Sequence, residues 1–343
     1  MMRSRKNTHR LWGVKVRSFN EIDLIFAPID IGQPSSGVRL APDVFTENQL
    51  IETLEKRGWI SHSKWVTQRA VGDSAKHSLE EFSRISEIIA SITAHSRERD
   101  RFCLTIGGDH AVALGSIGGL LKSNSKLGVV WVDAHGDVNT PSTSLTGNFH
   151  GMPLAGLLGI DDDNYWLNNF DWLDKHLDPK RLVFIGVRDL DPEEKRFIEE
   201  RKIKIVGMDE INNKGMNQIM DEVVDHLKTQ GCNEFHLSYD VDAIDPSFFP
   251  ATGTPVANGI SANDAIHLVE SLRLTGSLVS MDLVEFNPSL AKTPVDLNRS
   301  ITLSLDLVLT AVGHPGKKAG IHSKLLDCLN FFKLTKKFLS QNQ

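Results

Sequence analysis

The stretch LGVVWVDAHGD, residues 127–137, decides the fold. Its first six residues are apolar and rich in valine, as a strand buried on both faces should be. Its last five residues place Asp133, His135 and Asp137 at alternate positions directly after that run. Ligands bind outside the carboxyl ends of strands in open parallel sheets. The stretch therefore predicts an α/β protein with a site at the end of this strand.

The same rhythm continues in both directions along the chain. Short apolar runs predict strands at 22–28, 102–106, 127–132, 181–187, 203–206, 234–239 and 277–284. Stretches with helical spacing of apolar residues predict helices at 46–57, 79–96, 111–122, 192–202, 216–229, 262–272 and 296–312. We expect a doubly wound, mostly parallel sheet with helices on its faces. No repeat or linker interrupts the pattern, which favours a single domain over residues 22–330 and a short tail at 331–343.

Composition excludes several classes of function. The 343-residue chain has 38 Lys and Arg against 44 Asp and Glu, a net charge of −6, which disfavours nucleic-acid binding. No apolar run reaches the roughly 18 residues that a membrane-spanning helix needs. Three cysteines without close spacing indicate neither a disulfide framework nor a thiolate metal site. Residues 1–21 are basic, with no acid before Glu21, which fits a mitochondrial transit peptide or a solvated arm, the latter leaving the protein cytoplasmic.

Two other apolar runs also end in side chains that could bind a metal. Asp109 and His110 follow 102–106, and Asp240 and Asp242 follow 234–239. Residues two apart on an extended chain point the same way, so each pair or triplet can converge. Four carboxylates at one place repel one another unless cations neutralise them, which predicts two divalent ions. The alternative is that each Asp is merely a cap or turn residue.

Six blocks of sequence, in order, resemble the signature of the arginase, or ureohydrolase, family. They are GGDHAVALGS at 107–116, DAHGDVNT at 133–140, TGNFHG at 146–151, SYDVDAIDP at 238–246, GTPV at 253–256 and EFNP at 285–288. The resemblance runs from about residue 28 to 314. It implies a three-layer αβα fold and hydrolysis of L-arginine to L-ornithine and urea by a metal-bridging hydroxide at a binuclear manganese (Mn²⁺) site.

The resemblance also implies a role for each matching residue. The metal ligands would be His110, Asp133, His135, Asp137, Asp240 and Asp242, with Asp133 and Asp240 bridging. Glu285 would orient the guanidinium, and His150 would carry a proton to the leaving amine. The substrate contacts would be His135, Asn139, Thr146, Asn148, Asp191, Glu194, Thr254 and Glu285. The family further implies a homo-oligomer, a trimer.

Rival functions separate by substrate and by metal content. Agmatinase is the nearest rival, and guanidinobutyrase and formimidoylglutamase follow. A catalytically silent binding relative would have lost ligands, and a zinc deacetylase would need only one metal. A panel of guanidino substrates distinguishes the first group, and metal content distinguishes the last.

Overall fold

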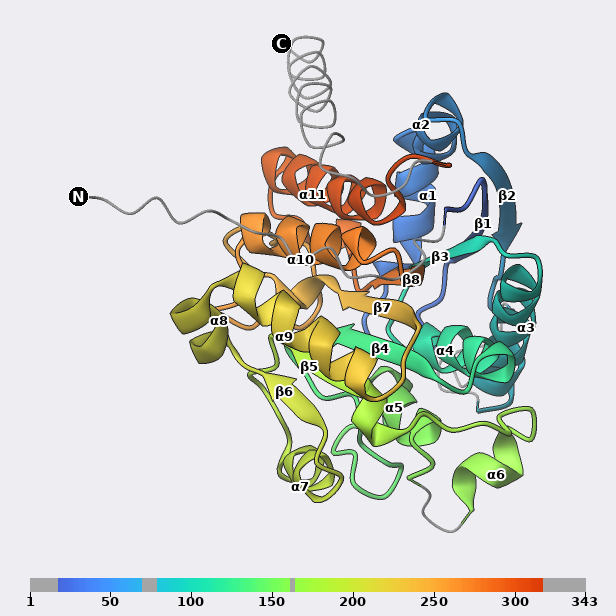
Figure 1. The fold of residues 1–343 in the computed structure, drawn as a ribbon, viewed down its shortest axis with the longest axis vertical. Coiled ribbons are helices and arrows are strands. Elements are labelled where there is room, and N and C mark those ends of the chain that lie inside the picture. Colours follow the sequence, from blue (N-terminus) through green and yellow to red (C-terminus); the bar gives the residue numbers. More distant parts are fainter. Residues whose placement is uncertain (1–17, 70–78, 161–163, 317–343) are drawn as a thin grey trace.

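A single parallel sheet of eight strands forms the centre of the structure, a computed structural model that describes residues 18–69, 79–160 and 164–316 (Figure 1). The strand order is β2-β1-β3-β8-β7-β4-β5-β6. The strands are β1 (Glu21–Ala27), β2 (Ile60–Trp65), β3 (Phe102–Gly107), β4 (Leu127–Val132), β5 (Leu182–Ile185), β6 (Lys204–Val206), β7 (Glu234–Asp240) and β8 (Leu278–Val284). All neighbouring strands pair in parallel, so every carboxyl end lies at one edge.

Helices cover both faces of the sheet, and the predicted three-layer α/β fold is confirmed (Figure 1). The helices are α1 (Ala41–Glu47), α2 (Leu50–Lys56), α3 (Leu79–Glu98), α4 (Val112–Ser123), α5 (Pro153–Leu157), α6 (Tyr165–Asn169), α7 (Pro192–Glu200), α8 (Met208–Lys214), α9 (Met216–Thr229), α10 (Ala262–Leu274) and α11 (Pro294–Val312). One layer packs α8, α9, α10 and α11 in a row, and the other packs α3, α4 and α5 together. Side-chain caps begin several helices, such as Ser261 before α10 and Thr293 before α11.

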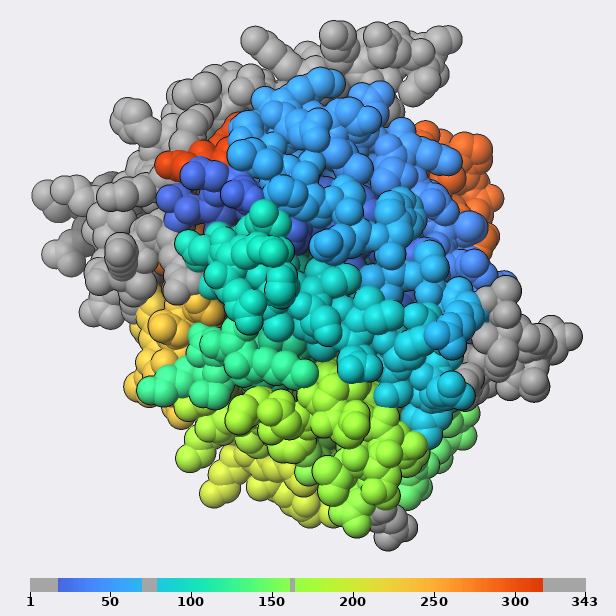
Figure 2. All heavy atoms as spheres, turned by 90° about the vertical axis from the view of Figure 1, so that its right-hand side faces the viewer, coloured from blue at the N-terminus to red at the C-terminus, as the bar shows by residue number. Residues whose placement is uncertain are grey.

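The contact between α3 and α4 fixes the helix that begins just after His110. A Cβ atom at Gly115 of α4 would lie 2.5 Å from the carbonyl oxygen of Ser86 on α3, so only glycine allows the two backbones to approach this closely. Figure 2 shows that the first half of the chain, coloured blue to green, builds most of the face that includes these helices.

One predicted helix needs correction, and one strand was not predicted. The helix expected at 46–57 is two helices, because Gln49 adopts a left-handed conformation (φ 60°) between α1 and α2. The edge strand β2 was missed, because its sequence ISHSKW is mostly exposed and shows no buried apolar face.

The basic segment at 1–21 falls almost wholly outside the described residues, and the tail at 331–343 does so entirely. None of the helices in 18–69, 79–160 and 164–316 has the length and apolar character that crossing a bilayer requires.

Candidate metal centre and substrate site

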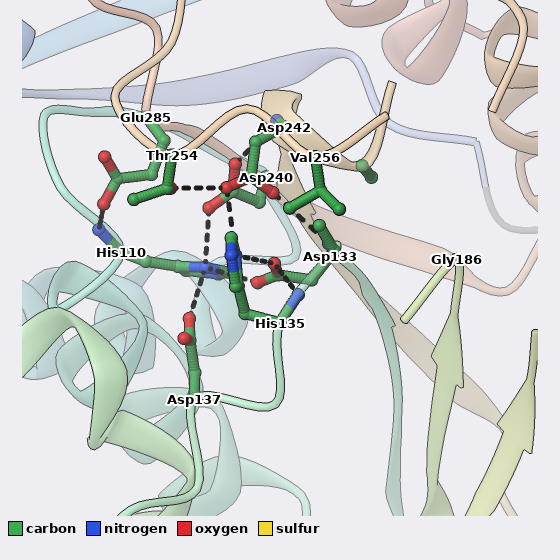
Figure 3. A network of polar contacts seen from close by, with 12 residues as sticks. His110, Asp133, His135, Asp137, Gly186, Asp240, Asp242, Thr254, Val256 and Glu285 are labelled. Carbon is green, nitrogen blue, oxygen red and sulfur yellow. Dashed lines mark hydrogen bonds and ion pairs between the residues drawn. The ribbon is translucent and has the colours of Figure 1, made fainter. Parts of the chain in front are cut away.

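Six of the side chains singled out from the sequence converge at the carboxyl edge of β3, β4 and β7, three of the four central strands (Figure 3). They are His110 after β3, Asp133, His135 and Asp137 after β4, and Asp240 and Asp242 at the end of β7 and in the 3-10 helix η5 (Val241–Ala243). Two groups of three have ligand atoms within 4.8 Å of one another, and both groups contain Asp133.

The first group is built around the buried imidazole of His110. Its Nδ1 lies 3.1 Å from Asp133 Oδ2, 3.0 Å from Asp137 Oδ2 and 3.3 Å from Asp240 Oδ2. Its Nε2 shares a hydrogen bond of 2.8 Å with Ser238 Oγ. Within the described residues Nδ1 has no hydrogen-bond partner of good geometry, although three carboxylates surround it. A divalent cation between these atoms would satisfy them all.

The second group is built around His135. Its Nδ1 lies 3.4 Å from Asp133 Oδ1 and 3.1 Å from Asp242 Oδ2. Asp242 Oδ2 also accepts a hydrogen bond of 2.8 Å from the Thr254 hydroxyl, as Figure 3 shows. Asp133 is therefore the residue that touches both imidazoles, as a bridging ligand would.

The electrostatics of the cluster are those of acids buried close to one another. Burial, together with Asp242 and Asp133, raises the pKa of Asp240 well above its ordinary value. Burial and Asp133 raise the pKa of Asp137 to about 6. Burial would also raise the pKa of Asp133, but the neighbouring imidazoles of His110 and His135 outweigh it and lower that pKa. Carboxylates that share a site in this way are the usual ligands of hard divalent ions.

Two residues that support the ligands were not singled out from the sequence. Trp131 Nε1 donates to Asp133 Oδ2 at 3.0 Å, and its ring stacks on His110 with centroids 4.1 Å apart. Ser238 orients His110 through Nε2. Ser238 and Trp131 each stand two residues before a ligand on their strands, so the strand period of two was a signal that could have found both.

Glu285 follows β8, which lies between β3 and β7. Its Oε1 accepts from the His110 backbone N–H at 2.9 Å and lies 3.1 Å from His150 Nδ1. Its Oε2 accepts from Gln33 Nε2 at 2.6 Å. Burial would raise the pKa of Glu285, but these donors, His150 first, lower it. Burial in turn would lower the pKa of His150, but Glu285 outweighs it and raises that pKa to about 9.

Gln33 lies in a loop whose position depends on Asp109. The Asp109 carboxylate accepts from the backbone N–H of Gly32 at 2.6 Å and of Ala111 at 3.0 Å, which ties the loop to the end of β3. Burial and the nearby Glu285 raise the pKa of Asp109 to about 7. No pattern in the sequence marked Gln33, because a lone amide in a loop carries no periodic signal.

Three of the expected substrate residues, Asn139, Asp191 and Glu194, form a second set connected by hydrogen bonds. Asn139 Nδ2 donates to Asp191 Oδ2 at 2.9 Å. Glu194 accepts from the backbone N–H of Val138 at 3.1 Å and of Asp191 at 3.0 Å, and with Asp191 forms the capping box of α7. Burial, then Asp137, raises the pKa of Glu194 to about 7.

Thr146 and Asn148 make their hydrogen bonds apart from Asn139, Asp191 and Glu194. Thr146 is exposed, and its hydroxyl accepts from the Asn148 backbone N–H at 3.3 Å. Among the described residues, the hydrogen bonds of these two stay inside the loop that leads to His150. The structure therefore brings Asn139, Asp191 and Glu194 together, whereas the hydrogen bonds of Thr146 and Asn148 are local to residues 146–151.

Imidazoles and carboxylates gathered at the carboxyl edge of a parallel α/β sheet are the ligand set of a metal-dependent enzyme of this fold class. The model of the family described as "Arginase family" matches residues 20–313, and the chain belongs to this family. It is therefore a hydrolase acting on linear amidines.

Individual relatives extend the match over most of the chain. It is 36% identical to arginase-1 of Oryctolagus cuniculus over 301 residues, which cover 85% of this chain and 92% of the rabbit protein. The structure of arginase from Bacillus caldovelox is similar with a TM-score of 0.78 at 34% identity, covering 87% of this chain and 100% of that one. The Entamoeba histolytica arginase in complex with L-ornithine is similar with a TM-score of 0.78 at 28% identity, covering the same shares.

Proposed function

We propose that this chain hydrolyses L-arginine to L-ornithine and urea at a binuclear manganese site. The observation that carries the proposal is the position of Glu285, whose carboxylate lies against the backbone of His110 at the edge of the six-residue cluster. A carboxylate can hold a guanidinium by paired hydrogen bonds, so a substrate carbon held there would face the cluster. The similarity to an arginase crystallised with L-ornithine supports the same substrate class.

His110, Asp133, Asp137 and Asp240 would hold one ion, and His135, Asp133, Asp240 and Asp242 the other. Two imidazoles with an oxygen-rich remainder and no thiolate suit manganese. When bound, such ions neutralise the carboxylates and supply a water-derived nucleophile near neutral pH.

The residues of the chain orient the substrate and move the proton. Gln33 and the His110 backbone N–H hold the Glu285 carboxylate in place to accept the guanidinium N–H groups. His150 keeps its proton at neutral pH because its pKa is about 9. It can therefore donate that proton to the departing amine as urea forms.

The far end of the substrate would meet Asn139, Asp191 and the loop that follows Asn139. This loop, residues 139–148, is rich in hydroxyl and amide groups, which can pair with an α-carboxylate without adding charge. Asp191 would accept from the α-ammonium. Agmatine lacks the carboxylate, so a site built for arginine leaves its own polar groups unpaired with agmatine.

Urea release from L-arginine, agmatine and 4-guanidinobutyrate, with added Mn²⁺, tests the substrate. We expect arginine to be preferred over agmatine by at least about 100-fold in kcat/KM. Asp191→Ala should reduce this ratio by lowering kcat/KM for arginine. The control Asp225→Ala, at an exposed position of α9, should not change the ratio. If agmatine were turned over as well as arginine, the assignment would change from arginase to agmatinase.

Metal titration tests the centre independently of the substrate. The protein should bind about two Mn²⁺ ions per chain and lose activity on chelation. Asp133→Asn should weaken the binding of both ions, because the carboxylate oxygens of Asp133 lie beside both imidazoles. A stoichiometry of one would contradict the binuclear site.

The family resemblance also supports a homo-oligomer of three copies, which light scattering measures directly.

A further inference from the structure

Arg188 uses its whole guanidinium to bind main-chain carbonyls around Asp242. Nη2 donates to the carbonyl oxygens of Asp242 at 2.8 Å and Val256 at 2.7 Å. Nη1 donates to those of Gly186 at 3.0 Å and Ala243 at 3.2 Å, and Nε donates to that of Ala257 at 3.2 Å. A guanidinium has five N–H groups, and here all five are used.

These five carbonyls belong to three segments that are separate in the sequence. Gly186 follows β5, Asp242 and Ala243 form η5 after β7, and the other two lie in the loop before α10. Figure 3 draws Val256 close to Asp133 and Asp242, with Gly186 further to the right at the end of its strand. Arg188 is half-buried. Burial lowers its pKa, and the nearby carboxylates of Asp242 and Asp133 oppose this effect.

The loop is shaped to enclose the guanidinium. A Cβ atom at Gly259 would lie 2.7 Å from Arg188 Nη2 and 2.6 Å from the backbone nitrogen of Asp245. Any side chain there would therefore push the loop away from the guanidinium. Beside it, the backbone N–H groups of Asp245 and Ile260 bond to the carbonyls of Ile260 and Ala243 at 3.0 Å and 2.9 Å.

We infer that Arg188 is a positioning residue for the His135 and Asp242 half of the metal site, an inference that rests on the proposed function. Arg188 holds the carbonyl of Asp242 and that of Val256, two residues after Thr254, whose hydroxyl bonds to the Asp242 carboxylate. It thus fixes both partners of the contact that orients this ligand. None of these five hydrogen bonds reaches His110 or Asp137 of the other half.

Arg188→Lys tests the inference, because lysine keeps the charge but loses the planar fork and two of the five donors. In Mn²⁺ calorimetry we expect one of the two ions to bind about 10- to 100-fold more weakly and the other to change less than about threefold. In double mutants, the loss of Mn²⁺ affinity caused by Arg188→Lys should be non-additive with that of Thr254→Val and additive with that of Asp137→Asn. This result would assign the effect of Arg188 to the Asp242 half of the site. The matched control is Arg97→Lys, a guanidinium paired with Glu234 at 2.8 Å at the amino end of β7. It should leave both affinities unchanged.

Hydrogen exchange of the metal-free protein provides a readout that needs neither metal nor substrate. The amides of Asp245 and Ile260 should exchange at least about tenfold faster in Arg188→Lys than in the parent, with the amides of β4 unchanged. Gly259→Ala, which leaves Arg188 in place but displaces the loop, should give the same pattern if Arg188→Lys folds poorly. Unchanged exchange, or equal weakening of both ions, would overturn the inference. A parent that binds only one ion would contradict the proposed function, while the exchange data would still decide whether Arg188 holds the loop.

Discussion

The backbone of Glu285 is held in a conformation that its side chain does not favour. Its φ is 62°, in the left-handed region, where a non-glycine residue is uncommon. The Glu285 backbone N–H bonds to the Gly108 carbonyl at 2.9 Å, two residues before His110, whose N–H holds the carboxylate. Asp137 is left-handed as well, with φ 49°. Such conformations cost roughly 1–3 kcal/mol and persist where surrounding contacts enforce them, as at binding sites.

Replacing Gln33 should affect substrate binding more than turnover. Gln33→Leu removes the 2.6 Å donor from Glu285 Oε2 and keeps the size of the side chain. A hydrogen bond to a charged group contributes about 1.5–3 kcal/mol, so KM for arginine should rise by about 10- to 100-fold. Steady-state kinetics check this, with metal content measured in parallel. Gln218→Leu is the control, because its amide also donates to a carboxylate, that of Glu222, at an exposed position of α9. An unchanged KM would show that Gln33 does not orient Glu285.

Removing the imidazole of His150 should leave both ions bound and lower kcat. Proton transfer by a placed side chain contributes about 10²- to 10⁴-fold, so His150→Ala should lose about that much. Added imidazole should restore part of the rate. Loss of metal together with activity would instead make His150 a structural residue.

The pH profile of kcat reports the proton on His150. Glu285 raises the pKa of His150 to about 9, so the protonated form that can donate dominates at neutral pH. The parent should lose kcat as pH rises through about 9, and His150→Ala should not show that alkaline decline. A decline of equal size in both proteins would assign it to another group.

At the scale of elements, the sequence predicted best where a segment is buried on one face or on both. The helix 216–229 and the strand 127–132 match α9 and β4 in both bounds. Strand 181–187 is shorter in the structure, ending at Ile185, because Gly186 turns the chain with φ 90°. The edge strand β2 was not predicted, because its exposed residues do not alternate between apolar and polar.

The residues of the candidate site likewise fall into those that the sequence could predict and those that it could not. Ligands that follow strands could be predicted because strand ends of a parallel sheet meet at one edge. Gln33 and Arg188 could not, because each acts through a loop whose path depends on contacts distant in sequence, 252 residues away for Gln33 and Glu285. The sequence contains these residues but no local pattern that shows their partners.

Helix α11 contains an acid that should make stability depend on pH. Burial raises the pKa of Asp306 from 3.8 to about 7, although Arg57 opposes this. Between these values the unfolded chain releases the proton and the folded protein keeps it, so the free energy of unfolding falls as pH rises from about 4 to about 7. Asp306→Asn should remove this loss.

Above pH 7, Asp306→Asn should exceed the parent in stability by about 1–2 kcal/mol, less than the full shift implies because the side chain is partly exposed. Near pH 4 the two should agree. Urea denaturation at both pH values measures this, with Asp221→Asn at an exposed position of α9 as the control. An advantage that does not change with pH would point to packing instead of ionisation.

At the scale of the whole molecule, the carboxylate cluster makes stability depend on divalent ions. Without cations, four buried or nearly buried acids repel one another at the centre of the sheet. Each ion at 100 times its Kd adds about 2.7 kcal/mol to the folded state, so Mn²⁺ should raise Tm by about 10 °C over the chelated protein. Calorimetric scans with Mn²⁺ and with chelator check this. Asp133→Asn should lose most of the shift and Asp225→Asn should keep it, and a Tm indifferent to Mn²⁺ would contradict the cation site.

The strand order has a consequence for how the chain acquires its site during synthesis. Strands β3 and β4 follow one another in sequence but are separated in the sheet by β8 and β7, which are made last. A ribosome that adds about 5–20 residues per second therefore presents His110 and Asp133 many seconds before the strands that must enter between them. Until then the two halves of the sheet have unpaired inner edges, the feature of a nascent chain that chaperones bind and that aggregates when exposed. Completion of the metal centre and closure of the sheet are then one late event, and a chain cut before β8 would lose the fold as a whole instead of a detachable end.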